Sequence, residues 1–426
     1  MLDAQYVVEH LHQVRENCRH RNVRVDLDPI PQLYDEKKRL SKEVQALQQR
    51  QNEQQKLTGK EKDPTRRQAL IEEGRQLREQ VQQLENQQRE IDQQLKLHLL
   101  TIPNLSHPDA PVGTTAGDNK VIKTWGSPTK FDFKPKDHVC LAEALDLVDF
   151  EAGAAVAGQK FYFLKNAAAL LEIALIQYAM TKLVKAGFTP IITPDLAKAD
   201  VLEGIGFIPR GPETQIYAVE NTDLCLVATA EITLGGMHRD QILDEVRLPL
   251  RYVGLSHCFR TEAGAPGRDT RGLYRVHQFT KVEMFVFCTP EQGEAEHQQL
   301  LKIEEEIFQG LGLPYQVIDT CTGDLGGPAY RKYDVEAWMP GRGEQGEYGE
   351  VTSTSNCTDY QARRLNIRFK QAGVKGTRYA YTLNGTAVAI SRALVALFEN
   401  YQQADGSIII PEVLRPWVGM DKITKP

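Results

Sequence analysis

The sequence predicts an α+β protein: an antiparallel α-helical coiled-coil arm, then a domain built on a mostly antiparallel β-sheet flanked by helices. Residues 33–98 hold two heptad-patterned runs joined by a short turn, which is the pattern of a two-helix arm. Beyond residue 104, apolar runs of strand length are separated by turns rather than by repeated helices. This favours an antiparallel sheet over a doubly wound one. A chain of 426 residues is long enough for two such domains.

The arm is predicted from apolar residues that recur every seven positions in two segments rich in Gln, Glu, Lys and Arg. Both segments, 33–57 and 70–95, lack internal proline. We expect residues 58–65 to form the turn, with Asp63 or Thr65 capping the second helix. Helices joined so closely must run antiparallel, which gives an arm on the order of 40 Å long. The heptad positions are Leu33, Leu40 and Leu47 in the first segment and Leu70, Leu77, Leu84 and Ile91 in the second.

The arm differs in charge from the rest of the chain. Residues 33–98 contain 14 Lys and Arg against 12 Asp and Glu, whereas the whole chain has a net charge of −6. A protein with this overall charge does not coat nucleic acid by bulk charge, so any RNA contact must be local. The alternative is that these charges only solvate a coiled coil. The candidate phosphate contacts are Lys37, Lys38, Arg39, Lys42, Arg66, Arg67, Arg75 and Arg78.

A domain boundary is predicted near residue 103, which separates an arm domain of residues 1–103 from a second domain of residues 104–426. The segment 102–113 contains three prolines and has no apolar periodicity. Beyond it, a strand at 161–164 and a long helix at 167–186 are expected. Further strands are predicted near 215–219, 225–229, 250–259, 275–287, 316–320, 332–338 and 347–352.

Composition excludes several classes of protein. A content of 41% hydrophobic and 25% charged residues is that of a soluble globular protein. Neither a membrane-spanning apolar run nor a signal-peptide pattern is present, so we expect a cytoplasmic location and no membrane contact. The seven cysteines are scattered without a Cys-x-x-Cys pair. Neither a disulfide framework nor a structural zinc site is therefore expected.

The segment with the most specific chemistry is a glycine-rich loop at 259–283. An Arg-x-Glu, Arg260 and Glu262, precedes the loop, and Arg275, Phe279 and Glu283 follow it at intervals of four. An arginine can bind phosphate through two donors, a carboxylate can accept from an exocyclic amine, and a phenylalanine can stack on a base. Together these groups can hold a bent ATP. On spacing alone, a polar hairpin loop with ordinary surface charges remains the alternative.

This loop resembles motif 2 of the class II aminoacyl-tRNA synthetases, and its residue sequence is similar to that of the seryl-tRNA synthetases of bacterial type. The resemblance extends from the helical arm to Pro-Glu-Val-Leu-Arg-Pro-Trp at 411–417. It implies that Arg260 holds the α-phosphate of ATP and acts in catalysis. Glu262 would accept from the adenine amine and Phe279 would stack on the ring. The same resemblance implies nucleotide contacts by Thr261 and Val276, and entry of the tRNA 3′ end along Arg268 and Arg271.

Three further segments resemble family motifs. Residues 383–392 resemble motif 3, whose arginine, Arg392, would cover the other side of the nucleotide. Residues 350–364 resemble the nucleotide segment, in which Glu350 and Ser353 would ligate Mg²⁺ on the ATP phosphates. Residues 187–194 resemble motif 1, which implies a homodimer interface near Pro194. The resemblance further implies that Glu350 and Arg392 act in catalysis. The residues of these two segments that it implies bind ATP are Glu350, Val351, Thr352, Ser353 and Arg392.

The same resemblance assigns the amino-acid pocket. Carboxylates suit both the ammonium and the small hydroxyl of serine, and a buried polar group penalises a ligand that leaves it unpaired. Many bacterial relatives have Asn-Gly-Ser-Gly in motif 3, whereas this chain has Asn-Gly-Thr-Ala at 384–387. Threonine keeps the hydroxyl but adds a methyl group. The serine-binding residues implied are Thr229, Ala230, Glu231, Arg260, Glu283, Asn384 and Thr386.

The function implied is ATP-dependent attachment of serine to tRNA(Ser) through a seryl-adenylate, with tRNA(Sec) as a second substrate. The partners are then ATP, serine, both tRNAs and a second copy of the chain, and the cofactor is Mg²⁺. Two alternatives lack aminoacylation of tRNA: an RNA-binding paralogue, and a ligase that charges a carrier protein. The first should have lost Arg260, Glu262, Glu350 or Arg392, all of which are present. The second is disfavoured because the synthetase-like ligases that charge a carrier protein lack the long N-terminal hairpin, and this chain has it.

Overall fold

The structure is a computed structural model that describes residues 1–207, 215–262 and 272–425. Its internal contacts divide the chain into two compact units, Met1–Pro103 and Asn104–Pro426. Each unit has its own buried apolar residues. The α+β fold class expected from the sequence is confirmed.

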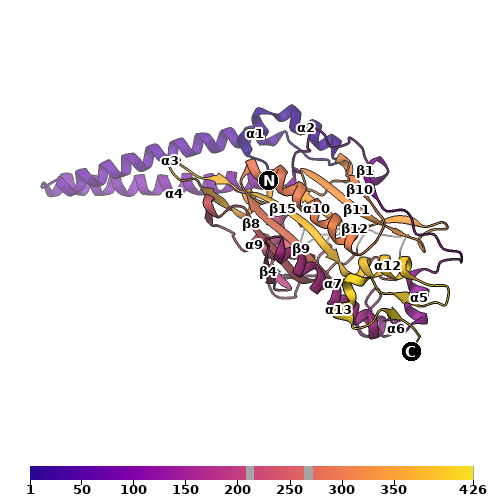
Figure 1. The fold of residues 1–426 in the computed structure, drawn as a ribbon. Helices are drawn as coiled ribbons and strands as arrows, with labels where there is room; N and C mark the ends of the chain where they lie inside the picture. The colour runs from indigo at the N-terminus through magenta and orange to yellow at the C-terminus, as the bar shows by residue number, and fades with distance from the viewer. Residues whose placement is uncertain (208–214, 263–271, 426) are drawn as a thin grey trace. The chain divides into compact units, whose positions relative to one another are not determined.

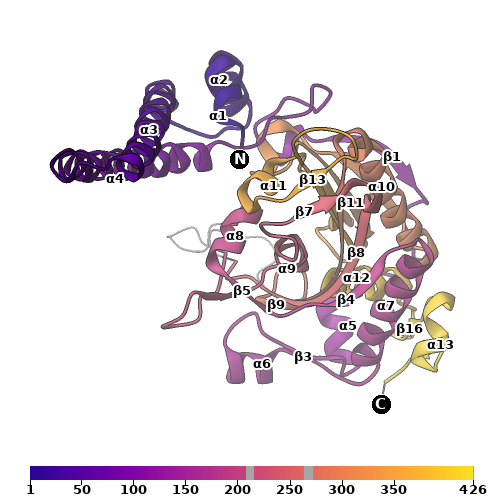
Figure 2. The same ribbon diagram turned by 90° about the vertical axis from the view of Figure 1, so that its left-hand side faces the viewer.

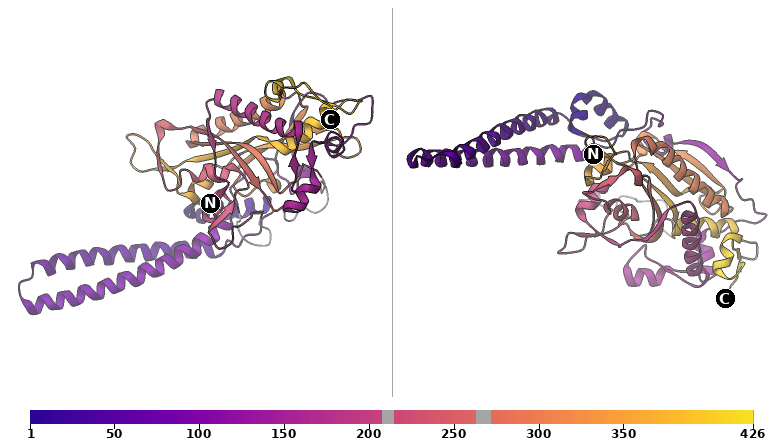
Figure 3. Two further views of the ribbon diagram at one scale, coloured as in Figure 1. Left: turned by 90° about the horizontal axis from the view of Figure 1, so that it is seen from below. Right: turned by 60° about the vertical axis from the view of Figure 1, so that its left-hand side comes forward.

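The first unit is a helical hairpin preceded by two short helices, α1 (Ala4–Glu9) and α2 (Leu11–His20). Helices α3 (Pro29–Lys60) and α4 (Pro64–Thr101) lie side by side and antiparallel (Figure 3). Leu40, Val44, Leu77 and Val81 are buried along their seam, as the heptads require.

The turn of the hairpin is shorter than predicted, because α3 continues through Thr58 and Gly59 to Lys60. Only Glu61, Lys62 and Asp63 connect the helices. Of the two predicted caps, Asp63 is the one used, since its carboxylate accepts from the Arg66 backbone N–H at 2.9 Å. Proline at the next position completes the helix start.

The second unit is organised by an eight-stranded sheet in the order β1-β10-β11-β12-β15-β9-β8-β4 (Figure 2). Every neighbouring pair is antiparallel except β4 with β8. The strands are β1 (Lys120–Trp125), β4 (Thr189–Ile192), β8 (Leu250–Phe259), β9 (Gln278–Cys288), β10 (Tyr315–Asp319), β11 (Arg331–Met339), β12 (Glu347–Asn356) and β15 (Tyr381–Ala389).

Helices cover both faces of this sheet (Figure 1). The larger apolar core lies between one face and α7 (Asn166–Lys185), α10 (Gly293–Gly310) and α12 (Ile390–Tyr401). Val282 and Met284 of β9 point into this core, whereas the alternate residues Phe285 and Phe287 point into a second core. That second core is shared with α8 (Ala199–Ile205), α9 (Ala230–Gly236) and α11 (Tyr360–Leu365). The alternation along β9 therefore assigns each side chain to one layer.

Smaller elements complete the unit. Two-stranded sheets are formed by β2 with β3, β5 with β6, and β16 with β17, and a three-stranded sheet has the order β14-β13-β7. The remaining bounds are α5 (His138–Ala144), β2 (Val148–Asp149), α6 (Phe150–Ala157), β3 (Phe163–Leu164), β5 (Leu196–Lys198), β6 (Leu224–Leu226), β7 (Ile242–Asp244), β13 (Arg368–Lys370), β14 (Arg378–Tyr379), β16 (Ile408–Ile409), α13 (Arg415–Val418) and β17 (Lys422–Ile423).

Several predicted strands differ from the structure. Within the described residues 215–219 there is only an isolated bridge from Ala218 to Cys225, in place of a strand. The strand expected at 225–229 ends at Leu226, because Thr229 caps α9 instead. The strand expected at 161–164 is limited to Phe163–Leu164, and β12 extends beyond 352 to Asn356. Local apolar composition does not reveal where a strand gives way to a helix cap.

Helix α7 is long and apolar enough to cross a membrane by length and composition alone. Leu171, Ala174, Leu175, Ala179 and Leu183 are nevertheless fully or almost fully buried in the main core. Packing under the sheet thus accounts for the buried apolar side of α7, whereas Leu170, Ile173 and Val184 on the same helix are exposed.

Candidate active site

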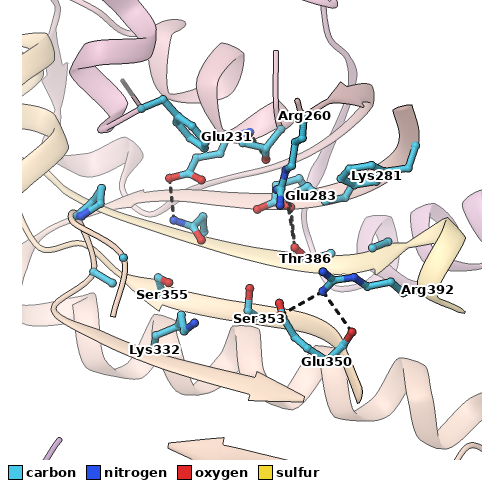
Figure 4. Close-up of a pocket in the computed structure, with 18 of the residues that line it drawn as sticks. Glu231, Arg260, Lys281, Glu283, Lys332, Glu350, Ser353, Ser355, Thr386 and Arg392 are labelled. Carbon is cyan, nitrogen blue, oxygen red and sulfur yellow. Dashed lines mark hydrogen bonds and ion pairs between the residues drawn. The ribbon is translucent and has the colours of Figure 1, made fainter. Parts of the chain in front are cut away.

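A cavity of about 350 Å³ opens on the sheet face that carries α8, α9 and α11. Its floor is formed by β9, β12 and β15, and its walls by the starts of α9 and α12 and by the loop at 326–329. Figure 4 shows two groups of side chains in this cavity. We call them the Glu350 end (Lys332, Glu350, Ser353 and Arg392) and the Glu231 end (Thr229, Glu231, Glu283, Asn384 and Thr386).

The Glu350 end is organised by an ion pair between β12 and α12. Arg392 Nη1 lies 3.2 Å from Glu350 Oε2 and also donates to the Glu350 carbonyl at 3.2 Å. The pocket leaves 40% of the Glu350 side chain accessible. Burial by itself would raise the pKa of Glu350, but Arg392 and Lys332 outweigh it and hold this pKa at about 2. Glu350 is therefore ionised at every physiological pH.

Tyr274 contacts this ion pair. Its ring packs against two guanidinium groups, with the Arg392 carbon 4.9 Å and the Arg342 carbon 4.2 Å from the ring centroid. The Tyr274 hydroxyl donates to the Glu350 carbonyl at 3.2 Å. The cation–π contact and this hydrogen bond orient the aromatic ring and Arg392 together.

The Glu350 end has the donor chemistry for Mg²⁺. The Glu350 carboxylate and the Ser353 hydroxyl come from the same strand and line the same cavity. Mg²⁺ prefers oxygen ligands and commonly takes only one or two from protein, the others being phosphates and water. Within residues 1–207, 215–262 and 272–425, His, Cys, Asp and Glu side chains form no group of three or more that could hold a metal. A cation shared with phosphate fits this site better than a closed protein cage does.

At the Glu231 end, a buried triangle joins β9 to β15. Glu283 is 1% exposed and lies 2.5 Å from Lys281 Nζ. The Thr386 hydroxyl donates to the same Glu283 oxygen at 3.0 Å. Lys281 also lies 3.4 Å from Thr386 Oγ1. Glu283 is thus a fixed acceptor beside a fixed hydroxyl, an arrangement suited to a small polar ligand.

Glu231 in the same end is surrounded by neutral donors. Its Oε1 atom accepts from the side-chain amides of Gln361 at 2.7 Å and Asn384 at 2.9 Å. Burial raises the pKa of Glu231 to about 7, and the nearby Glu283 carboxylate adds to the rise. The hydrogen bond from Gln361 and the charges of Lys281 and Arg260 oppose it only in part. A ligand cation would favour the ionised form.

Arg260 stands between the two ends. Its charge lowers the pKa of both Glu231 and Glu350. Its guanidinium carbon lies 5.3 Å from the centroid of the Phe279 ring, and its Nε donates to the Ala228 carbonyl at 3.4 Å. Val276 and Phe279 line the cavity beside it. One guanidinium group therefore faces both halves of the pocket.

Glu262, predicted to accept from an adenine amine, also lines the cavity. Its carboxylate is 3.4 Å from Arg275 Nη1, so the two ends of the predicted motif 2 meet in an ion pair. The backbone of Glu262 has a positive φ of 50°, which is uncommon for a residue other than glycine. Arg268 and Arg271, expected along the path of the tRNA end, lie outside the described residues.

Three other predicted site residues have side chains directed elsewhere. Ala230 and Val351 are buried in the second and the main apolar core, respectively. The Thr352 hydroxyl donates to the Thr386 carbonyl. A contact from these three positions to a ligand would have to come from the backbone. The backbone N–H of Thr261, a fourth predicted residue, donates to the Gln215 carbonyl.

Some cavity residues were not among the sequence candidates. Lys281 could have been found from the alternation of β9, because it lies between Phe279 and Glu283 on the same face. Lys332 and Ser355 are opposite each other on β11 and β12. The sequence holds no comparable local signal for Lys332, since its place depends on strand pairing.

Two family models match the chain. The seryl-tRNA synthetase N-terminal domain matches residues 1–106, and the tRNA synthetase class II core domain (G, H, P, S and T) matches residues 216–401. Together they cover the arm and almost all of the cavity described above.

Two serine--tRNA ligases and one crystal structure are similar to this chain over nearly its full length. The serine--tRNA ligase of Treponema denticola is 55% identical over 423 residues, which is 99% of this chain and 100% of that protein. That of Rhodopirellula baltica is 56% identical over 422 residues, 99% of each chain. The crystal structure of seryl-tRNA synthetase from Pyrococcus horikoshii complexed with ATP has a TM-score of 0.88 and 39% identity, with 100% of both chains covered.

Proposed function

The chain belongs to the seryl-tRNA synthetases, the ligases that attach serine to tRNA, and we propose that it does so by way of a seryl-adenylate. The observation that carries this proposal is the position of Arg260, whose charge acts on both the Glu231 end and the Glu350 end of one cavity. A group in that position can contact the α-phosphate of ATP and the carboxylate of serine at once. Such a bridge is what an attack of one anion on another requires.

In the proposed first step, a serine carboxylate oxygen attacks the α-phosphorus of ATP and pyrophosphate leaves. Arg260 and Arg392 neutralise the charge that spreads over the phosphoryl oxygens. Glu350 and Ser353 are the residues to hold Mg²⁺, which supplies further positive charge on the phosphates when it is bound. Val276 and Phe279 form the wall against which the adenine ring lies, and Glu262 accepts from its amine.

In the proposed second step, a terminal ribose hydroxyl of tRNA attacks the serine carbonyl carbon and AMP leaves. The Glu231 end selects the amino acid. Glu231 faces the serine ammonium, and Glu283 with Thr386 takes the hydroxyl. Alanine would leave these buried groups unpaired, which is costly in a closed site.

The test of this proposal is serine-dependent exchange of pyrophosphate with ATP, followed by charging of tRNA. We expect exchange with serine and Mg²⁺ present and with no tRNA added. A folded protein that exchanges nothing would exclude the adenylate. Exchange without charging of tRNA(Ser) would favour the alternatives without aminoacylation of tRNA.

We propose that the arm contacts RNA near its turn. Arg67, Arg75 and Arg78 line a cavity of about 500 Å³ between α3 and α4, together with Gln51 and Gln55. Arg75 also pairs with Glu72 at 3.1 Å, and other candidate cations pair within the arm away from this cavity, for example Lys37 with Asp92 at 2.8 Å. Arginines around a groove suit phosphates of a helical RNA element, which is recognised by shape.

Reversing the charge of Arg67 and Arg78 tests the arm without deleting it. We expect the KM for tRNA in aminoacylation to rise about tenfold or more, because the arm would then neutralise fewer phosphates of the RNA. Pyrophosphate exchange should be unchanged. The matched control reverses Lys130 and Lys134, two exposed lysines of the second unit. An equal rise in KM for both variants would contradict a specific role for the arm.

Serylation of tRNA(Sec) is the second part of the RNA proposal. Recognition by shape through the arm does not depend on the anticodon, so two tRNAs with different anticodons can share it. Charging of a tRNA(Sec) transcript with serine is the direct assay. A transcript that stays uncharged under conditions that charge tRNA(Ser) would refute this part alone.

We propose a homodimer that is formed through the motif 1 elements. Ile173 on α7 is 62% exposed and Ile192 on β4 is 83% exposed, and Leu170, Val184 and Leu196 add to the same apolar set. Large exposed apolar side chains gathered on adjoining elements mark protein interfaces. Ile192→Asp should convert the protein from dimer to monomer in sedimentation analysis, whereas a monomeric wild type would refute the dimer.

We also propose a cytoplasmic location, because that is where tRNA is charged for translation.

A further inference from the structure

Glu304 is a buried carboxyl group directly behind the Glu231 end, and it has no part in the proposed reaction steps. It lies on α10, on the opposite face of the sheet from the cavity, and is 0% exposed. Among the residues that the structure describes, neither of its carboxyl oxygens has a hydrogen-bond partner of ordinary geometry. A buried polar group without partners is costly, so its retention requires a reason.

The strands above Glu304 separate at this point. β12 and β15 pair only over residues 354–356 and 383–385. At the last pair and just beyond it, two threonine hydroxyls hydrogen-bond across from β12 to β15. Thr354 donates to the Asn384 carbonyl at 2.9 Å, and Thr352 donates to the Thr386 carbonyl. Both acceptors belong to residues that line the Glu231 end.

Glu304 reaches this gap because residue 385 is glycine. A Cβ atom at Gly385 would lie 2.8 Å from Glu304 Oε1 and 3.1 Å from Thr354 Oγ1. Any side chain there would have to displace the carboxyl group or the hydroxyl. The glycine, the threonine hydroxyls and the carboxyl group therefore meet behind the serine-facing strand.

The direction of hydrogen bonding follows from the donor count. Thr352 has one hydroxyl hydrogen, and it is used on the Thr386 carbonyl. Toward Glu304, with which its side chain also interacts, Thr352 can then only accept. Glu304 must supply the hydrogen, which only the neutral acid can do.

The surroundings of Glu304 favour the neutral acid. Burial raises its pKa well above the usual value, and Glu283 on β9 and Asp334 on β11 raise it further. Lys281 and the interaction with the Thr352 side chain lower the pKa but do not outweigh these causes. An ionised Glu304 would attract the Thr352 hydroxyl hydrogen and release the Thr386 carbonyl.

We propose that Glu304 is a positioning residue for serine selection: as a neutral donor it orients the Thr352 hydroxyl, which fixes the Thr386 backbone and so the hydroxyl that faces Glu283. This inference rests on the proposed function, since it assigns Thr386 to the serine end of the pocket. It predicts that the KM for serine depends on a hydrogen-bond donor at position 304 and not on the side-chain volume there.

Two substitutions at position 304 separate these roles. Glu304→Gln keeps a donor of similar shape, and Glu304→Leu keeps the volume but removes the donor. In serine-dependent pyrophosphate exchange, we expect the Gln variant to stay within about twofold of wild type. The Leu variant should raise the KM for serine about tenfold or more, with the KM for ATP changed less than about twofold.

Thr352→Val tests the same chain of hydrogen bonds from its middle and decides the matter if the Leu variant does not fold. We expect a similar rise in the KM for serine. The double variant should be no worse than about twofold beyond the worse single one, because both remove one chain of hydrogen bonds. Glu305→Leu is the matched control: this buried neighbour accepts from Tyr315 at 2.8 Å and pairs with Lys123 at 2.7 Å instead.

The outcomes are distinguishable. A wild-type KM for serine in a folded Glu304→Leu or Thr352→Val protein would overturn the proposal. So would a Gln variant as impaired as the Leu variant, or a Glu305→Leu control with the same serine-specific defect. Absence of serine-dependent exchange in the wild type would instead refute the proposed function on which the inference rests.

Discussion

Glu350 and Glu231, one carboxylate from each end of the pocket, have opposite pKa shifts. Glu350 lies 3.2 Å from a guanidinium nitrogen of its own chain, and its pKa falls to about 2. Glu231 accepts hydrogen bonds from the neutral amides of Gln361 and Asn384, and its pKa rises to about 7 because burial and Glu283 disfavour its charge. Both carboxylates line one cavity about 350 Å³ in volume.

The difference indicates how each end is completed. The Glu350 end carries its own cation, so it is prepared for phosphates and their Mg²⁺ before any ligand arrives. The Glu231 end holds an acceptor whose charge is disfavoured until a cation comes close. The ammonium group of serine is such a cation, which makes amino-acid binding and ionisation of Glu231 mutually supportive.

The largest expected effect comes from removing the built-in cation. Arg392→Ala should lower kcat for pyrophosphate exchange on the order of a thousandfold, the loss typical for a charged group that stabilises the transition state. Arg392→Lys should recover only part, because it lacks the planar donor fork. Steady-state kinetics with ATP as the varied substrate measures both.

The matched control for that prediction is Arg342→Ala. Arg342 also packs against the Tyr274 ring, at 4.2 Å from its centroid, but it is not among the described residues that line the main cavity. Its removal should cost far less activity than Arg392→Ala. Equal losses would show that the stack on Tyr274, rather than the charge of Arg392, is what the Glu350 end needs.

The next largest effect belongs to the other end. Glu231→Gln should raise the KM for serine about thirtyfold, the equivalent of about 2 kcal/mol for a hydrogen bond to a charged group. The KM for ATP should hardly change. Exchange kinetics with each substrate varied in turn provides the comparison, and an effect on ATP as large as that on serine would contradict the division of the pocket.

Serine binding should depend on pH, and ATP binding should not. Below pH 7 the Glu231 carboxyl is protonated, so the KM for serine should fall about tenfold per pH unit as pH rises toward 7, and then level off. Glu350, with a pKa of about 2, does not titrate in this range. A serine KM that is flat from about pH 5.5 to about pH 8.5 would show that Glu231 is not the titrating group.

The sequence predicted the elements of both ends more completely than their electrostatics. The cavity residues of motif 2, motif 3 and the 350–364 segment lie on β9, β12, β15 and α12 or close to the ends of β8, β9 and β12. The spacing of Arg260, Phe279 and Glu283 marks them as candidates, and the family resemblance implies their roles. The opposite charge states of Glu231 and Glu350 could not be predicted, because they depend on distant neighbours such as Gln361 and Arg392 that only the fold brings close.

The same distinction holds for the fold. Heptads along α3 and α4 predicted the hairpin well, since each contact repeats at a fixed sequence interval. Edge strand β1 and most short strands of the small sheets were not predicted, because their pairing is decided by partners far along the chain. The exceptions are β3 and β6, which overlap the strands predicted at 161–164 and 225–229. Glu304 illustrates the limit: its sequence neighbours make it one acidic residue of an amphipathic helix, and only the gap between β12 and β15 gives it a role.

The most direct test of the contrast is the thermal stability of Glu231→Gln and Glu350→Gln, measured side by side without ligands at about pH 5 and about pH 8. The raised pKa of Glu231 means that its ionisation costs stability as pH rises from about 4.5 to about 7, by about 3 kcal/mol at most. Gln avoids that cost. Glu350, whose pKa is lowered, stabilises the fold at any pH above its usual range, and Gln leaves Arg392 without its partner.

We therefore predict that Glu231→Gln raises the unfolding midpoint at pH 8 by on the order of 3 °C and changes it little at pH 5. Glu350→Gln should lower the midpoint at both pH values. If both variants shift stability in the same direction at pH 8, the two ends of the pocket do not differ in charge compensation, and the account of how serine and ATP are divided between them is wrong.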